Sequence, residues 1–450
     1  MIKGFTQYFI KTFGKIRPEG ILLSSFILLI IVGTILLWLP FCHSGKVGFS
    51  EALFTSVSAV CVTGLTVVDT RLDFTFFGQV VILILIQLGG LGVMTFAALT
   101  FELLGKRLSL AGQSAMTNSL VHEELLQGFR RYFRKILLLL FSIELIGAIA
   151  LFVSMMPSQD ILYSMYSAIF HSVSAFCNAG FSIYTDNLTG FSQNYLFIGI
   201  IAILIIIGGI GHPVIFDLVK VFKVYKKARK PFFSLLTIHT RITVGMTLFL
   251  LVFGSIILAV TNIANNSFDL SSAIFQSVSA RTAGFNTIII GQLPLSSLLV
   301  LVVLMFIGGS PGSSAGGVKT TTFAIWITQI FSWLKGNKSV IIQDRYIPKT
   351  LVRRSTTIIS LAILLNIIGI FVLSITEPGI SLNEILFEQV SAFGTVGLST
   401  GLTPQLSEWG RIWIIVTMFI GRTGSLTAVI FLLRKNHIDV KYPEGKVMIG

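Results

Sequence analysis

Long apolar runs alternate with short polar connections along the whole chain. Eight of these runs approach the roughly 20 residues that a helix needs to cross the hydrocarbon core of a bilayer. The runs cover residues 21–40, 74–98, 136–155, 195–210, 242–260, 295–308, 358–375 and 412–433. Little sequence remains for a soluble domain. The pattern therefore predicts an all-α membrane protein with eight transmembrane helices.

A shorter apolar stretch that ends in glycine lies between the two members of each pair of runs. The four stretches read ALFTSVSAVCVTGLTVVDT from Ala52, AIFHSVSAFCNAGFSIYTD from Ala168, AIFQSVSARTAGFNTI from Ala273 and ILFEQVSAFGTVGLSTG from Ile385. Each contains Phe, then Val-Ser-Ala, then Gly followed by Leu or Phe. The glycines Gly64, Gly180, Gly284 and Gly397 lie about 105 to 115 residues apart, which indicates an internal repeat. The predicted repeats are 1–105, 106–230, 231–345 and 346–450.

The short stretches predict re-entrant segments. About ten residues are too few to cross a bilayer, and irregular backbone at membrane depth persists only where it is buried in protein or lines an aqueous cavity. Four such segments with the same orientation can surround one axis. Each repeat is therefore predicted to contain a span, a re-entrant pore helix, a filter loop and a second span around one central pore.

The loops that follow the short stretches contain small and β-branched residues with almost no side chains suited to catalysis. Glycine tolerates a positive φ and lets the backbone turn its carbonyls to one side. Four loops then form rings of carbonyl oxygens that replace the hydration shell of a monovalent cation. An ordinary glycine helix cap is the alternative for any one loop, and four equivalent loops favour the pore. The predicted filter residues are Val62, Thr63, Gly64, Asn178, Ala179, Gly180, Thr282, Ala283, Gly284, Thr395, Val396 and Gly397.

Composition and charge agree with a membrane protein. Apolar residues make up 54% of the chain and charged residues 12%, well below the roughly 25% charge of soluble domains. The net charge of +14 comes from Lys and Arg in alternate connections, at 3–17, 106–107, 130–135, 220–241, 335–354 and 434–446. This positive-inside pattern argues against nucleic-acid binding and predicts that both termini are cytoplasmic.

Acidic residues occupy the connections on the opposite side. They are Glu51, Asp69, Asp73, Asp160, Asp186, Asp269, Glu377, Glu384 and Glu388. Glu51, Asp69, Asp269 and Glu384 are expected at the outer mouth, where their field would concentrate cations.

Residues that serve catalysis or metal binding are sparse. Cys42, Cys61 and Cys177 form neither a disulfide framework nor a CxxC pair. The 6 histidines form no HExxH set, and His171 is expected to pack or cap. The first apolar run is too long for a cleavable signal peptide, so we expect it to remain as a helix. These features argue against an enzyme.

A cluster of glycine, serine and proline interrupts the sixth apolar run and predicts a broken helix that lines the cavity. A phosphate-binding loop is excluded because the GxxxxGK[ST] spacing and a preceding strand are both missing. The predicted gate residues in this segment are Gly308, Gly309, Ser310, Pro311, Gly312, Ser313, Ser314, Ala315, Gly316 and Gly317. At Gly89, Gly92, Gly208 and Gly211 in the other repeats, we expect close helix packing.

Two basic residues complete the predicted gate. Arg422 takes the place that glycine has in the other repeats, at Gly90, Gly209 and Gly309. There the guanidinium would face the pore below the filter and bind carbonyls of the gate segment, or else it would snorkel to water. Lys319 either belongs to the gate or reaches the cytoplasmic interface. An inverted-repeat transporter is not favoured, because all four glycine loops lie on one side.

The sequence TVGLS at 395–399 resembles a shortened potassium-channel filter. Four such units in one chain, each with one filter glycine, resemble the superfamily of K⁺ transporters that includes the TrkH, KtrB and plant HKT proteins. The resemblance covers nearly the whole chain, and its compact length is most similar to the KtrB type of bacterial Ktr systems. It implies channel-like K⁺ uptake across the bacterial plasma membrane. Glycine at all four positions favours K⁺, since serine at the first is associated with Na⁺ transport in this superfamily.

The resemblance also implies partners and control. Subunits of the KtrB type form homodimers in which each protomer has its own pore, and the segment 308–317 corresponds to an intramembrane gate. The partner would be a KtrA-like cytosolic ring of RCK-type subunits that bind ATP, ADP or NAD(H); this chain itself would bind only K⁺. A less selective Na⁺ or NH₄⁺ channel and a Na⁺-coupled K⁺ symporter remain alternatives. The third repeat departs from the pattern, because its loop is one residue shorter and contains Arg281.

Overall fold

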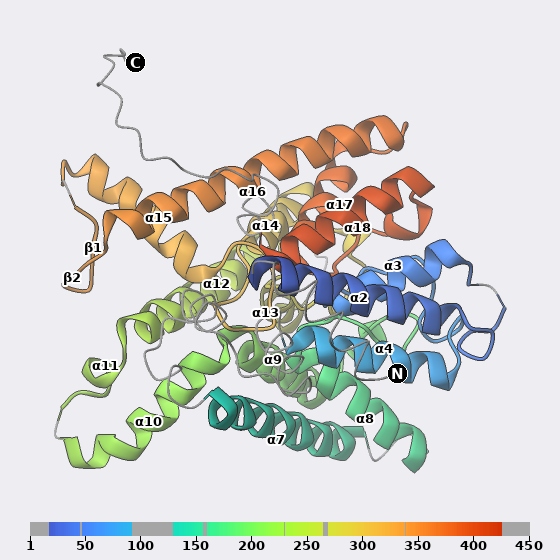
Figure 1. Cartoon of the computed structure of the whole chain (residues 1–450), viewed down its shortest axis with the longest axis horizontal. Coiled ribbons are helices and arrows are strands. Elements are labelled where there is room, and N and C mark those ends of the chain that lie inside the picture. The colour runs from blue at the N-terminus through green and yellow to red at the C-terminus, as the bar shows by residue number, and fades with distance from the viewer. Residues whose placement is uncertain are drawn as a thin grey trace, which may run out of the picture.

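Helices form nearly all the regular structure of the computed structural model, which describes residues 18–45, 47–91, 129–155, 160–228, 230–263, 269–337 and 339–424 (Figure 1). Four triplets of consecutive helices are α2 Pro18–Trp38, α3 Phe49–Val60 and α4 Phe76–Gly90; α7 Phe129–Met155, α8 Ile161–Phe176 and α9 Tyr195–Ile210; α12 Ile238–Ile263, α13 Leu270–Ser279 and α14 Leu295–Phe306; and α16 Lys349–Thr376, α17 Leu382–Gly394 and α18 Glu408–Thr423. The connecting elements are α10 His212–Ala228, α11 Phe232–Leu235, α15 Thr320–Leu334 and the single-turn helices η2 Thr189–Phe191, η3 Ile290–Gln292 and η4 Thr403–Gln405.

A small hairpin departs from the all-helical expectation within the described residues. Strand β1, Ile341–Ile342, pairs antiparallel with β2, Arg345–Tyr346. The turn residues Gln343 and Asp344 both have positive φ, 49° and 61°. Val340 and Ile347, which flank the strands, pack on Val352 of α16. The hairpin is therefore a short packed connection between α15 and α16.

Three helices in the described residues are long and apolar enough to cross a membrane by length and composition, namely Phe133–Met155, Ile238–Thr261 and Lys349–Thr376. A fourth span results if α9 and the first part of α10, which meet at 96°, are counted as one. Parts of two other predicted spans, at 92–98 and 425–433, lie outside the described residues. The count of eight transmembrane helices stays a prediction.

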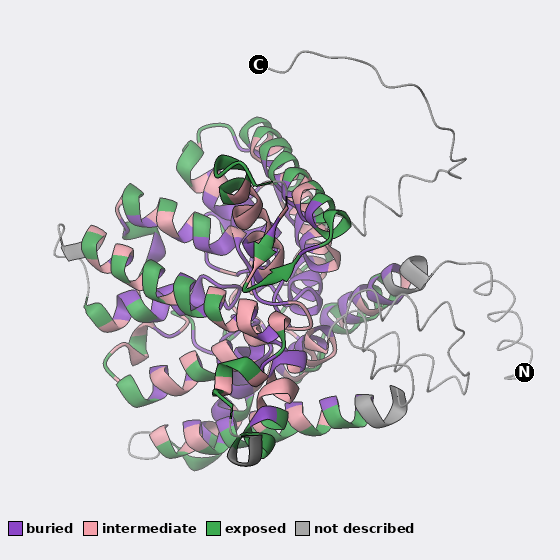
Figure 2. Ribbon diagram, turned by 90° about the vertical axis from the view of Figure 1, so that its left-hand side faces the viewer, coloured by how far each residue is buried: buried purple, intermediate pink, exposed green. Residues whose placement is uncertain are grey.

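The second helix of each triplet lies inside the molecule, and the first and third helices surround it. The second helices α3, α8, α13 and α17 each bury a phenylalanine at no more than 2% exposure, in Phe54, Phe170, Phe275 and Phe387. Figure 2, viewed from the end that carries the β hairpin, shows buried residues concentrated inside the molecule, behind the exposed hairpin, and many exposed ones on the outer helices. Many exposed residues of the first helices are apolar, for example Leu145 of α7, Phe253 of α12 and Phe371 of α16. A surface of this kind suits lipid rather than water.

The triplets are arranged in a closed circle. The third helix of each triplet packs on the second helix of the next: α4 on α8, α9 on α13, and α14 on α17. The last triplet completes the circle, because α18 packs on α3. The loops that follow the second helices consequently meet at the centre.

Side-chain oxygens fix the starts of several helices by accepting from free backbone N–H groups. Asn194 accepts from Phe197 N at the start of α9, and Ser407 accepts from Gly410 N at the start of α18. Ser381 and Glu384 form a reciprocal capping box at the start of α17. These caps fix where the helices begin at one end of the molecule.

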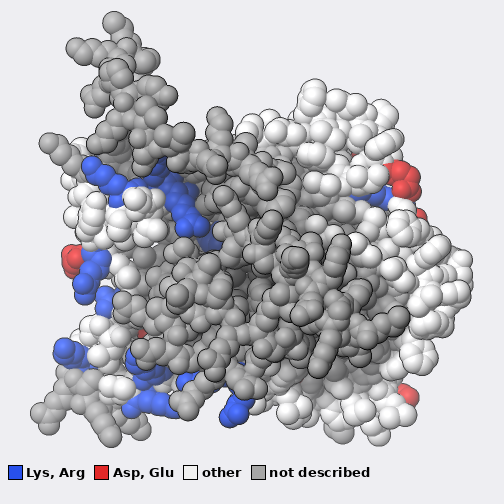
Figure 3. Space-filling view, in the orientation of Figure 1, with Lys and Arg blue, Asp and Glu red and all other residues white. Residues whose placement is uncertain are grey.

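Charge separates the two ends of the molecule (Figure 3). Basic atoms are seen mainly at the end formed by α10, α11 and the β hairpin, and acidic atoms mainly at the opposite end. The exposed basic residues include Lys220, Lys223, Lys230, Lys335, Arg345, Lys349, Arg353 and Arg354. Part of the predicted basic sequence, at 3–17, 106–107 and 434–446, lies outside the described residues.

Candidate functional site: four glycine segments and the loop beside them

The four glycine segments share one backbone conformation. Each is a triplet that begins and ends with a residue of positive φ. The first residues are Val62 at 55°, Asn178 at 59°, Thr282 at 71° and Thr395 at 49°. The last are Gly64 at 90°, Gly180 at 69°, Gly284 at 75° and Gly397 at 97°. Because such φ values are unfavourable for residues with a Cβ, the repetition in four places indicates a conformation that the surrounding structure imposes.

The glycines form a closed ring. A Cβ placed on Gly64 would meet Ala179 O, one on Gly180 would lie 2.7 Å from Ala283 O, and one on Gly284 would meet Val396 O. The ring closes because a Cβ on Gly397 would meet Thr63 O. At each step the neighbour is the carbonyl of the residue that precedes the next glycine. Four backbone carbonyls and four glycines from distant parts of the chain therefore surround one point.

The serine of each Val-Ser-Ala motif holds its glycine segment. Ser58 accepts from Gly64 N at 3.1 Å, and Ser391 accepts from Gly397 N at 3.2 Å. Ser174 donates to Phe181 O at 2.7 Å, and Ser279 donates to Phe285 O. The motif recurs because the backbone of each glycine segment, buried and outside any helix, needs a hydrogen-bond partner.

The serine two residues earlier ties three of the short helices to the helix before them. Ser56 donates to Ile30 O of α2 at 2.9 Å, and Ser172 donates to Glu144 O of α7 at 2.6 Å. Ser277 donates to Leu251 O of α12 at 3.0 Å. The short helices are thus held at the depth that places their C-terminal ends at the ring.

Glycines in the third helices allow close contact with these C-terminal ends, as the sequence predicts for Gly89 and Gly208. A Cβ would meet Val60 O at Gly89, Phe176 O at Gly208 and Phe393 O at Gly421. Gly211 is closely packed as well, but against the 307–319 segment, since a Cβ there would lie 2.9 Å from Pro311 O. This residue has a φ of 89° and lies where α9 turns by 96° into α10, so it permits a bend. The expectation for Gly92 lies outside the described residues.

An irregular segment, the 307–319 loop, separates α14 from α15. Its two ends are held together by hydrogen bonds from Gly308 N to Val318 O at 2.9 Å and from Thr320 N to Gly309 O at 3.1 Å. Ser310 Oγ lies 3.1 Å from Thr320 Oγ1. The two ends of the loop therefore lie side by side, and the loop interrupts the helical structure where the break was predicted, at 308–317.

The loop lies against the glycine segments and the bend of α9. A Cβ on Gly308 would lie 3.3 Å from Thr282 Cγ2, and one on Gly316 would meet Thr395 Oγ1. Ser314 Oγ donates to Phe176 O at 3.3 Å. The remaining contacts are with the α9–α10 bend: Ser310 N donates to Gly209 O at 3.0 Å, and His212 N donates to Gly312 O at 3.3 Å. Parts of three triplets therefore contact one loop.

Arg422 of α18 is buried, with 9% of its surface exposed. Its guanidinium donates to Ser314 O of the 307–319 loop and to Gly89 O of α4. The side chain joins three segments and does not extend to the surface. Lys319, the residue before α15, also turns inward, and its Nζ donates to Ala315 O of the same loop.

The four acids expected to attract cations at the mouth each have a local partner, and their effect on cations stays a prediction. Asp69 accepts from Arg71 N and Leu72 N, and Asp269 accepts from Leu270 N at the start of α13. Glu384 belongs to the capping box of α17. Glu51 forms an ion pair of 2.8 Å with Arg411, which it shares with Glu408.

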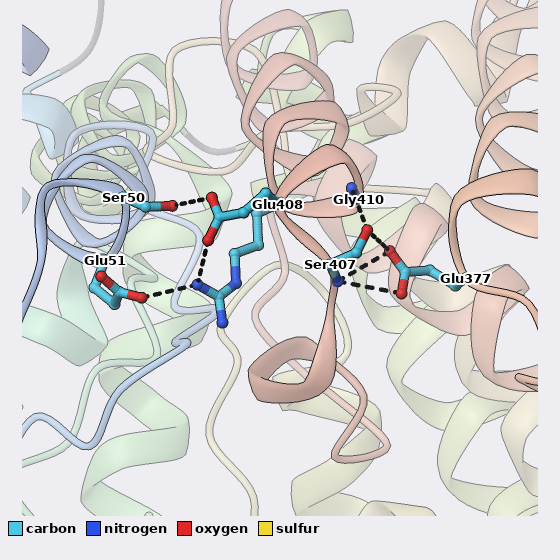
Figure 4. Close-up of polar contacts among 7 residues, drawn as sticks. Ser50, Glu51, Glu377, Ser407, Glu408 and Gly410 are labelled. Atoms are coloured by element: carbon cyan, nitrogen blue, oxygen red, sulfur yellow. Dashed lines mark hydrogen bonds and ion pairs between the residues drawn. The ribbon is translucent and has the colours of Figure 1, made fainter.

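The Glu51 contact is part of a polar cluster that joins α3 to α18 (Figure 4). Arg411 also contacts Glu408 at 3.2 Å, and Ser50 donates to Glu408 at 2.7 Å. Close by, Ser407 donates to Glu377 at 2.6 Å. The cluster lies where the last triplet meets the first, so it closes the circle of helices at the acidic end.

Comparison with known sequences decides the family. Residues 17–438 match the family described as TrkH, cation transport protein. The chain belongs to the TrkH family. It is 37% identical over 444 residues to Ktr system potassium uptake protein B of Bacillus subtilis (strain 168), with 97% of each chain covered.

Two further TrkH-type sequences and one structure agree. The chain is 37% identical over 438 residues to Ktr system potassium uptake protein B of Vibrio alginolyticus, covering 96% of this chain and 94% of the relative. It is 37% identical over 451 residues to potassium/sodium uptake protein NtpJ of Enterococcus hirae, covering 97% and 98%. The crystal structure of the potassium transporter TrkH from Vibrio parahaemolyticus matches in fold, with a TM-score of 0.70 at 20% identity over 93% of this chain and 85% of that one.

Membership of the TrkH family makes the chain a cation transporter of the membrane and not an enzyme. The geometry agrees with transport, because the ring presents backbone carbonyls rather than reactive side chains. Carbonyl dipoles coordinate cations without chemical change.

Two buried acids of this TrkH-family chain were not recognised as special from its sequence. Glu144 in α7 is 5% exposed and accepts from Gln87 Nε2 at 3.2 Å. Glu388 lies in a connection opposite the basic ones, as the sequence indicates, but it is fully buried there within α17. Two signals in the sequence could have identified them. Glu144 is an acid inside an apolar run. Glu388 aligns with the polar residues His171 and Gln276 of the other repeats.

Proposed function

We propose that this chain carries K⁺ across the bacterial plasma membrane by passive permeation through the ring of glycine segments. The observation that carries the proposal is the closed ring of Thr63 O, Ala179 O, Ala283 O and Val396 O beside the four glycines. Four carbonyls of this kind can replace the water that surrounds a monovalent cation. Three relatives at 37% identity are named for potassium uptake, and one of these names includes sodium.

In this proposal each triplet of helices is one unit of span, pore helix and span, and the four filter segments are those predicted from the sequence. The ends of α3, α8, α13 and α17 point their partly negative C-termini toward the ring, which favours a cation. The basic end of the molecule faces the cytoplasm under the positive-inside rule. Both termini would then be cytoplasmic.

Flux measurements test the function directly. Purified protein in liposomes is expected to admit K⁺ and Rb⁺ down their gradients, with Na⁺ and NH₄⁺ entering less readily. A K⁺ flux that requires a Na⁺ gradient would favour the symporter, and equal fluxes of K⁺ and Na⁺ would favour a non-selective channel. Liposomes that contain no protein provide the control for leakage unrelated to the ring.

The 307–319 loop acts as the gate in this proposal. It lies against Thr282 and Thr395, and Arg422 and Lys319 both bind its carbonyls. Its contact with the α9–α10 bend adds a link to the basic end, where a cytosolic partner could act. That partner would be a KtrA-like ring of RCK-type subunits that bind ATP, ADP or NAD(H), and the chain would form a homodimer.

Shortening the loop is expected to raise the flux. Deleting 311–315 removes the hydrogen bond from Arg422 to Ser314 O and the one from Ser314 to Phe176 O. The hydrogen bonds of Gly308 N and Thr320 N at the base of the loop remain. K⁺ flux in liposomes should rise about tenfold or more, since 1.4 kcal/mol of lost closure energy suffices for that change. Ser313→Ala, which keeps the length of the loop, is the control. A folded deletion variant with the flux of the original chain would contradict the gate.

A further inference from the structure

The residue that follows the buried phenylalanine of each short helix is polar in all four cases. These residues are Thr55, His171, Gln276 and Glu388, and none is more than 1% exposed. Burying a polar group away from water is unfavourable unless it finds hydrogen-bond partners. Four buried polar residues at one position of the repeat therefore indicate a role other than packing.

Glu388 finds its partners in the chain that leaves the ring. It accepts from Ser399 Oγ, from Thr400 N at 3.1 Å, from Thr400 Oγ1 at 3.4 Å and from Thr403 Oγ1 at 2.8 Å. All four groups are donors, and all belong to a segment that starts two residues after Gly397. A carboxylate satisfied only by donors is held by charge-assisted hydrogen bonds, which are stronger than neutral ones. One side chain of α17 thus fixes the exit of the fourth glycine segment.

His171 makes the corresponding contact in the second triplet. Its Nε2 lies 3.0 Å from Ser182 Oγ, and Ser182 follows Gly180 by two residues, as Ser399 follows Gly397. Nδ1 lies 2.8 Å from Ser167 O, a contact that only a protonated Nδ1 can use as a hydrogen bond. The imidazole also stacks on Tyr184, with ring centres 4.9 Å apart. The ring is therefore fixed on both edges and one face.

The two remaining positions make no such connection. Thr55 Oγ1 and both amide atoms of Gln276 lack hydrogen-bond partners among the described residues. Around the glycine ring, Gly180 and Gly397 each neighbour Gly64 and Gly284, so they face one another across the ring. The strong connections thus hold two opposite segments, and the other two segments lack them.

We infer that Glu388, with His171 opposite it, is a positioning residue that sets the cation preference of the ring. The inference rests on the proposed permeation through the glycine segments. Glu388 does not touch the cation. It holds the 399–403 segment, and through it the orientation of Gly397 and of the carbonyl before it. A ring whose carbonyls are held in place favours one cation radius, and a looser ring adapts to smaller cations.

The test compares Glu388→Gln with Glu384→Gln, the same chemical change on the same helix. Glutamine at 388 keeps the size but turns an amide N–H₂ toward groups that are already donors. Rb⁺ uptake into liposomes is measured with Na⁺ as competitor, at physiological ionic strength. The ratio of Rb⁺ uptake to Na⁺ uptake is expected to fall about tenfold, because this is the effect of losing one charge-assisted hydrogen bond of ordinary strength. Glu384→Gln is expected to keep the original ratio, because glutamine also serves in a capping box.

A double-mutant comparison separates positioning from general damage. Ser399→Ala removes one donor to Glu388. In a chain that already carries Glu388→Gln, it should therefore change the ratio little further. Two outcomes would overturn the inference, provided that the original chain prefers Rb⁺. One is that the effects of Ser399→Ala and Glu388→Gln on the ratio add. The other is that a folded Glu388→Gln protein keeps the original ratio. An original chain that does not discriminate between the ions would instead overturn the proposed function. If Glu388→Gln does not fold, Thr403→Val tests the same contact from the other side and must also lower the ratio.

Discussion

Gly397→Ser is expected to remove most of the preference for K⁺ over Na⁺, and Gly180→Ser to affect it least among the four ring glycines. Gly397 has the largest φ of the four, 97°, and a Cβ there would meet Thr63 O. Gly180 has a φ of 69°, near the left-handed region that other residues can enter, and its Cβ would lie 2.7 Å from Ala283 O. A residue forced into positive φ loses about 1 to 2 kcal/mol, and the clash with a ring carbonyl adds to this.

The measurement is competitive Rb⁺ uptake with Na⁺ for each of the four single variants. A loss of about tenfold in selectivity at Gly397 corresponds to 1.4 kcal/mol. Gly379→Ser serves as the control, because its φ is 94° but no atom lies within 4 Å of its Cβ position. Equal selectivity in all four ring variants and the original chain would exclude the carbonyl ring as the filter.

Arg422→Ala is expected to increase K⁺ flux about tenfold or more. The substitution removes two hydrogen bonds from a charged donor and leaves the carbonyls of Ser314 and Gly89 without that partner. Hydrogen bonds to charged groups contribute about 1.5 to 3 kcal/mol each, so the loop should open more often. It also removes a positive charge beside the cation path. Arg411→Ala, on the same helix but at the acidic end, is the control and should not raise the flux.

Arg422→Lys separates the two effects. Lysine keeps the charge but lacks the planar fork that joins two carbonyls. Flux between those of the original chain and Arg422→Ala would indicate that bridging matters, and flux near the original would indicate charge alone. In a chain that already lacks 311–315, the Ser314 partner is gone, so Arg422→Ala should increase the flux only by the effect of its charge, which is less than in the full-length loop. A full second increase in that background would contradict the role of Arg422 in closing the loop.

The position of the ring could be predicted from the sequence because its chemistry limits the residues that fit. Only glycine fits a positive φ close to a neighbouring carbonyl, as at Gly397 and its three equivalents. The serine of Val-Ser-Ala is needed because it forms a hydrogen bond with the same backbone. The break at 308–317 was visible for a similar reason, since glycine and proline do not sustain a helix. Local conformation leaves a local signal in these cases.

Contacts that depend on the packed structure left a weaker signal. Glu388 was grouped with the other acids of the connections opposite the basic ones, and its burial was not predicted, because acidic residues are seldom fully buried. The ion pair of Glu51 was not predicted, because its partner Arg411 lies 360 residues away in the chain. Gly211 resembles the other packing glycines in sequence, but it packs on Pro311 of the 307–319 loop and lies at a bend.

The cluster of Glu51 and Arg411 has a consequence for how the protein is made. Because it joins the first triplet to the last, the circle cannot close until 360 further residues have been synthesised. At about 5 to 20 residues per second, this takes roughly 20 to 70 seconds. During that interval the face of α3 that will receive α18 has no partner from its own chain. The acidic-end ion pair is therefore among the last contacts to form during biogenesis, and a ribosome stalled before Arg411 would hold an open arc rather than a ring.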